Sequence, residues 1–176
     1  MPTALSGGDG HLKVKTLTTI GILTALALII FIVEAQIPPP VAVPGVKLGL
    51  ANVVTLITLI FLGRREAGLV LAARIILGSI FAGSVSTIIF SATGGVFCFA
   101  VMAFTVNRIP RKQLWVVSVL GAIAHNVGQL LAACFVMGTV SIWYYAPVLF
   151  ISAIVTGVFT GFCAMYLARY EKWIGK

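Results

Sequence analysis

The chain has 176 residues, of which 60% are hydrophobic and only 9% charged, and its mean hydropathy is +1.14. Soluble domains contain about 45–50% apolar and about 25% charged residues, so this composition excludes an ordinary soluble domain. At about 20 residues per membrane-spanning helix, the length fits about six spans and leaves no room for a soluble catalytic domain. The composition therefore predicts one all-α membrane domain with six transmembrane helices.

Apolar segments and loops follow one another along the chain. Residues 1–15 are predicted to be a disordered tail, because MPTALSGGDGH is polar and rich in glycine, and the membrane domain is expected to cover residues 16–176. The first predicted span, 16–36, ends at IPPPVAVPGVKLG, whose four prolines and two glycines cannot continue a helix. The second, 48–62, crosses the membrane only if this loop folds inward. The remaining spans are predicted at 66–82, 84–106, 114–137 and 142–168.

The basic residues predict the orientation of the bundle. Six spans place both termini on one side, and a cytoplasmic location of that side leaves Lys47 as the basic residue of the outer loops, with Arg74 inside the third span. The inner segments then hold ten basic residues: Lys13, Lys15, Arg64, Arg65, Arg108, Arg111, Lys112, Arg169, Lys172 and Lys176. This asymmetry follows the positive-inside rule, so we expect cytoplasmic termini and no binding of nucleic acid despite the net charge of +8.

A few polar side chains fall inside the predicted spans, where each costs roughly 2.5–3.5 kcal/mol unless it faces a cavity or a partner. They lie in the middle or the outer half of the bundle: Glu34, Asn52, Arg74, His125, Asn126 and Gln129, with Lys47 just before the second span. Their distribution predicts a polar cavity open to the outside, with the Pro-rich loop as its lid. Arg74 and Lys47 outnumber Glu34, which favours a ligand with a carboxylate or phosphate. Alternatively, Arg74 pairs with Glu34 or a carbonyl, and the polar groups of the fifth span only join helices.

The sequence lacks the residues that several kinds of binding and catalysis require. Cys98, Cys134 and Cys163 are widely spaced in apolar segments and indicate neither a disulfide framework nor a metal site. There is no P-loop motif for ATP, and we expect no cofactor. Asp9 is the one aspartate, so Asp-rich magnesium motifs of the kind used by prenyl diphosphate synthases are absent. Small residues recur at spacings of four, as in Gly21 and Ala25, which allows close helix packing.

Three stretches together resemble a known membrane family: PPPVAVPGVKLGLANVVTL (38–56), RIILGS (74–79) and GAIAHNVGQLLAA (121–133). They are similar to heptaprenyl diphosphate synthase component I, also called the Gx transporter family, which in turn resembles the S components of energy-coupling factor (ECF) vitamin transporters. The resemblance implies a bacterial multi-pass membrane protein with an S-component-like bundle. It also implies, as partners, a membrane coupling (T) protein that packs on Gly21 and Ala25 and two cytoplasmic ATPases.

Three hypotheses follow. In the first, the chain is a non-enzymatic substrate-binding component that captures a small anionic or amphipathic nutrient or precursor, related to a vitamin, quinone or isoprenoid, through Lys47, Asn52, Arg74, His125, Asn126 and Gln129. In the second, it is a membrane subunit of prenyl diphosphate or quinone synthesis in which His125 and Arg74 handle a diphosphate. In the third, it is a purely structural anchor for an electron-transfer complex, with an empty, dry interior.

Overall fold

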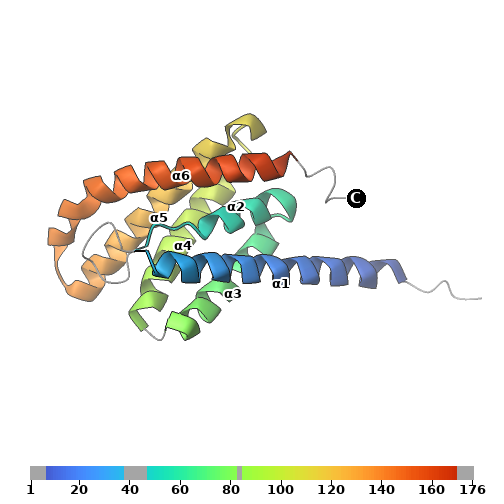
Figure 1. The fold of residues 1–176 in the computed structure, drawn as a ribbon, viewed down its shortest axis with the longest axis horizontal. Coiled ribbons are helices and arrows are strands. Elements are labelled where there is room, and N and C mark those ends of the chain that lie inside the picture. The colour runs from blue at the N-terminus through green and yellow to red at the C-terminus, as the bar shows by residue number, and fades with distance from the viewer. Residues whose placement is uncertain (1–6, 38–46, 83–84, 170–176) are drawn as a thin grey trace, which may run out of the picture.

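The computed structural model describes residues 7–37, 47–82 and 85–169, and all regular structure in these ranges is helical. The helices are α1 (Gly7–Ala35), α2 (Asn52–Phe61), α3 (Arg64–Ala82), α4 (Val85–Thr105), α5 (Leu114–Met137) and α6 (Ala146–Ala168), with short 3-10 turns η1 (Arg111–Gln113) and η2 (Val140–Tyr145) (Figure 1). The predicted all-α fold is confirmed.

Within the described ranges, four helical stretches are long and apolar enough to cross a membrane: Val14–Ala35, Thr87–Thr105, Arg111–Met137 and Val140–Ala168. The chain is therefore a multi-pass membrane protein by length and composition. The helix α2 has only 10 residues, and α3 begins with two arginines and a glutamate and carries Arg74 in its middle. These two helices do not meet the same criteria, so the count of six spans stays a prediction.

The boundaries of α5 match the predicted 114–137, whereas α1 begins at Gly7 rather than at Thr16. Residues 7–15, which the sequence analysis places in the tail, belong to α1, and the division of the chain at residue 15 stays a prediction. Hydropathy identifies the apolar part of a helix, which is the part that can lie in the membrane core, and does not identify where the helix itself begins. Once a helix has formed, its extension by further residues costs little, so its backbone can begin earlier than its apolar part.

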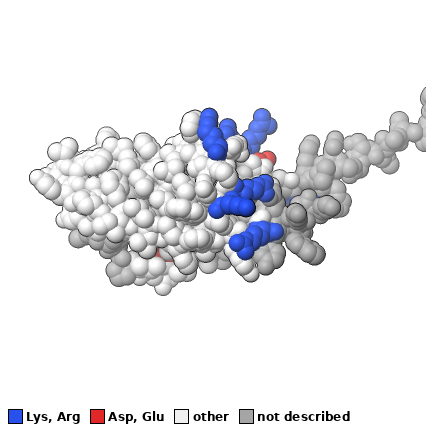
Figure 2. Space-filling view, turned by 90° about the horizontal axis from the view of Figure 1, so that it is seen from above, with Lys and Arg blue, Asp and Glu red and all other residues white. Residues whose placement is uncertain are grey.

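Both ends of the described chain lie at the same end of the helical bundle. The start of α1 and the end of α6 lie at the same end of the bundle (Figure 1). On the face shown in Figure 2, the coloured Lys and Arg side chains gather toward that end, and the opposite end shows none. This grouping agrees with the charge asymmetry in the sequence, and we call this end the basic end. That it faces the cytoplasm remains a prediction.

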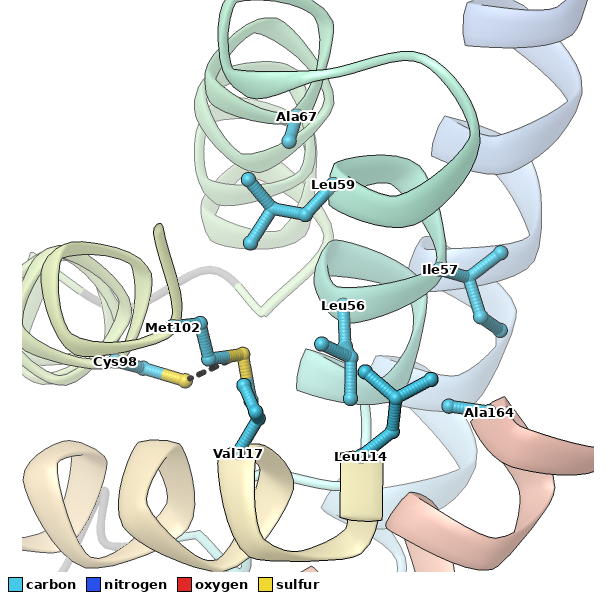
Figure 3. Close-up of a cluster of buried hydrophobic side chains, with 9 residues drawn as sticks. All are labelled: Leu56, Ile57, Leu59, Ala67, Cys98, Met102, Leu114, Val117 and Ala164. Atoms are coloured by element: carbon cyan, nitrogen blue, oxygen red, sulfur yellow. Dashed lines mark hydrogen bonds between the residues drawn. The ribbon is translucent and has the colours of Figure 1, made fainter. Parts of the chain in front are cut away.

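An apolar cluster fills the bundle toward the basic end (Figure 3). It joins the second half of α2 to the start of α3, the end of α4, the start of α5 and the end of α6, through Leu56, Ile57, Leu59, Ala67, Cys98, Met102, Leu114, Val117 and Ala164. The Cys98 Sγ and Met102 Sδ atoms lie 3.7 Å apart within it. These side chains are buried and pack on one another, so they form an apolar core toward this end of the bundle.

Candidate ligand-binding site

The structure buries the polar side chains that the sequence singled out. Each of them is less than 5% exposed: Glu34 on α1, Asn52 on α2, Arg74 on α3, and His125, Asn126 and Gln129 on α5. Lys47, in the segment before α2, is partly buried. They lie near the end of α1, the start of α2 and the middle of α3 and α5, beyond the apolar cluster as seen from the basic end.

The segment before α2 folds into the bundle, as the shortness of the second span predicted. The backbone N–H of Lys47 donates to Gln129 Oε1 at 3.3 Å, and the N–H of Gly49 donates to Glu34 Oε1 at 2.5 Å. Since α2 has 10 residues, it is only about 15 Å long, about half the thickness of a membrane core of about 30 Å. The predicted lid, residues 38–46, lies outside the described residues.

Two cations lie over the Phe31 ring, and one carboxylate interacts electrostatically with both of them. Lys47 Nζ lies 3.3 Å from the centroid of that ring, and Arg74 Cζ lies 5.8 Å from it. Both distances are within the range of cation–π attraction. Glu34 is attracted electrostatically by both cations. With one carboxylate against two cations, this group has a net positive charge, so it favours an anion.

His125 is enclosed by two glycines from different elements. A Cβ on Gly49, whose φ is +79°, would lie 2.9 Å from both His125 Cδ2 and Asn52 Nδ2. A Cβ on Gly94 of α4 would lie 2.7 Å from His125 Cε1. Since real Cβ atoms do not approach so closely, only glycine leaves room for the imidazole at both places. His125 and Asn52 are therefore neighbours across Gly49.

Within the part of the chain that the structure describes, seven buried side-chain atoms have no hydrogen-bond partner: Asn52 Nδ2 and Oδ1, Arg74 Nε and Nη2, His125 Nδ1 and Nε2, and Asn126 Oδ1. An unpartnered buried polar group costs about 1–3 kcal/mol, so native proteins rarely leave several together. Six of these seven atoms belong to Asn52, Arg74 and His125. Among the described residues, no group of three His, Cys, Asp or Glu side chains is placed to hold a metal ion.

Asn126 and Gln129 play different parts from their neighbours. Asn126 Nδ2 donates to the Leu149 carbonyl of α6 at 2.6 Å, so this amide joins two helices. Gln129 holds the inserted segment through its bond from Lys47. The contributions of Phe31 and Gly49 were missed by sequence reasoning, because an apolar ring and a loop glycine carry no signal of their own in an apolar chain.

Gly49→Ala is expected to displace the segment before α2. Gly138 provides a matched control, because its φ of +65° imposes the same left-handed strain but no atom lies within 4 Å of its added Cβ. Both variants lose about 1 kcal/mol from that strain, and Gly49→Ala loses more through its contacts with Asn52 and His125. Thermal unfolding in detergent measures the difference. Equal unfolding temperatures would show that this segment is not held as described.

The fold and the buried polar residues together define a class of protein. It is an all-helical, multi-pass membrane protein with buried, partly unpartnered polar groups beyond its apolar cluster. The chain belongs to the heptaprenyl diphosphate synthase component I family, whose family model matches residues 23–167. The match confirms the predicted family, and the matched range includes all the buried polar residues of the candidate site. No curated protein and no solved structure matches the chain.

Proposed function

We propose that this chain is the substrate-binding component of an ECF-type importer, and that it captures a small anionic or amphipathic nutrient or precursor from outside a bacterial cytoplasmic membrane. The observation that carries the proposal is the set of buried polar atoms without partners on Asn52, Arg74 and His125. A bound compound would satisfy these atoms, whereas an anchor with a dry interior would leave their cost unrecovered.

The direction of access is supported by the layout of the bundle. The apolar cluster occupies the parts of α2–α6 that lie toward the basic end, and the site lies beyond it. The segment that carries Lys47 and Gly49 reaches the site from the other side. If the basic end faces the cytoplasm, as the positive-inside rule predicts, the compound enters from outside.

The partner proposal rests on α1. Gly21 and Ala25 are both exposed, and no atom lies within 4 Å of a Cβ added to Gly21. Among the four membrane-crossing stretches, α1 is also the least buried inside the bundle. Small residues on an uncovered helix allow another helix to approach closely. This face therefore suits the coupling protein that the resemblance implies, which would work with two cytoplasmic ATPases.

The second candidate is a membrane component of heptaprenyl diphosphate synthase, as the family name suggests. We propose that the chain itself is not catalytic. Its single aspartate, Asp9, is distant in sequence from Arg74 and His125, and elongation of a prenyl diphosphate by the Asp-rich route needs paired carboxylate motifs that hold magnesium.

The wild-type chain tests both candidates. Purified in a mild detergent, it is expected to retain a small molecule that native mass spectrometry detects as added mass. Incubated with farnesyl diphosphate, isopentenyl diphosphate and magnesium, it is expected to give no longer prenyl product. Absence of any retained compound would contradict the importer proposal, and chain elongation by the isolated protein would replace it with the enzymatic one.

Gly21→Leu is expected to leave the fold intact and to break the partner complex. Gly21 is exposed and no atom lies within 4 Å of its added Cβ, so the unfolding temperature should stay within about 2 °C of the wild type, as for other exposed positions. Affinity purification of the tagged chain from its own membranes should recover ATPase subunits with the wild type but not with the variant. Val14→Leu, on the exposed surface of the same helix, is the control. Equal recovery with Gly21→Leu would remove this face from the interface.

A further inference from the structure

The unpartnered atoms of Arg74 lie along one edge of its guanidinium group. Nε and Nη2 carry parallel N–H bonds on that edge, which is the geometry that binds two oxygens of a carboxylate or phosphate at once. Nη2 would be 3.5 Å from a Cβ on Gly95, so this edge lies beside Gly95 of α4. One requirement of the site is thus an oxyanion.

Asn52 and His125 impose a second requirement. Both atoms of the Asn52 carboxamide are unpartnered, and neither ring nitrogen of His125 makes a hydrogen bond of good geometry, although the Gly94 backbone lies beside the ring. The carboxamide offers one acceptor and a donor, and a neutral imidazole offers one of each. The two side chains are neighbours across Gly49. Together they need a group that both donates and accepts hydrogen bonds.

We propose that the retained compound joins an oxyanion, bound side-on by Nε and Nη2 of Arg74, to an amide-type N–H and C=O pair, bound by the Asn52 carboxamide and the His125 imidazole. This inference rests on the proposed function and narrows its substrate class. A carboxylate or phosphate attached to a lactam, urea or carboxamide has this chemistry.

A prenyl diphosphate does not meet both requirements. Its ionised oxygens accept hydrogen bonds from Arg74, from Asn52 Nδ2 and from one imidazole nitrogen. Its hydrocarbon chain has no donor, so Asn52 Oδ1 and the other imidazole nitrogen stay unpartnered and keep their cost. The structure therefore favours a compound that contains nitrogen over the lipid precursor in the family's name.

The composition of the compound retained by the wild-type chain tests this inference. After release with organic solvent, its accurate mass gives the elemental formula, and exchange in deuterated solvent counts its N–H and O–H hydrogens. We expect an acidic compound with at least one nitrogen-bound exchangeable hydrogen. A retained compound with an oxyanion but without such a hydrogen overturns this inference and leaves the proposed function standing. Absence of any retained compound overturns both.

The variant Asn52→Leu provides a second test of this inference. Leucine has a similar volume and removes two unpartnered polar atoms, so the thermal midpoint should be unchanged or higher. The amount of retained compound should fall about tenfold, the effect of losing hydrogen bonds to it. Asn107→Leu, at an exposed position after α4, should retain the wild-type amount. Full retention of the compound in Asn52→Leu, whatever the thermal midpoint, would overturn the place of Asn52 in the site.

Discussion

Arg74→Gln is expected to lose the bound compound almost completely. Hydrogen bonds to a charged group contribute about 1.5–3 kcal/mol each, so losing a two-bond contact weakens binding by at least about 100-fold. Glutamine is shorter than arginine and has neither a charge nor a parallel pair of N–H bonds. Arg74→Lys keeps the charge without that pair and should bind with intermediate affinity.

The measurement is the amount of compound per mole of purified protein. Arg65→Gln is the matched control, because Arg65 lies on the same helix but is exposed near its start. It should retain the wild-type amount. Undiminished retention in Arg74→Gln would exclude this arginine from the site and leave it a structural role.

Glu34→Gln is expected to cause the largest loss of stability. The substitution keeps an oxygen that can accept the N–H of Gly49, but it removes the carboxylate that faces Arg74 and Lys47. Removing one partner from a buried group of charges costs about 3–5 kcal/mol, because the other charges stay buried without compensation. The free energy of unfolding in detergent should fall by about this amount.

Glu66→Gln is the control for Glu34→Gln. Glu66 lies in the first turn of α3 and is only partly buried, so its loss should cost less than about 1 kcal/mol. The double variant Glu34→Gln with Arg74→Gln should recover part of the lost stability, because it also removes one uncompensated cation. Additive losses in the double variant would show that the two residues do not interact.

Much of the architecture was predictable because membrane insertion depends on local composition. An apolar stretch of sufficient length forms a helix wherever it lies in the chain, so the fifth span was predicted at its observed boundaries. The start of α1 was predicted nine residues too late, since helix formation extends past the apolar region. The prediction that the loop before α2 folds inward also followed from length alone.

The site was predictable as a list of residues but not as an arrangement. Arg74, Asn52 and His125 stood out because polar side chains are expensive in a membrane. Asn126 was grouped with His125 and Gln129 by its spacing on the helix, yet its amide bonds to α6. Phe31, which lies beneath two cations, was not singled out, because one more aromatic ring in an apolar helix gives no signal.

The sequence by itself determined the class of the protein, its family and the few polar groups that the interior tolerates, because each of these depends on composition and local pattern. Only the tertiary structure decided which of those groups meet. The enclosure of His125 by Gly49 and Gly94 and the bond from Gly49 to Glu34 join residues from separate elements. Such contacts depend on how the helices pack, and packing depends on the shapes of many side chains at once, which no local pattern in the chain records.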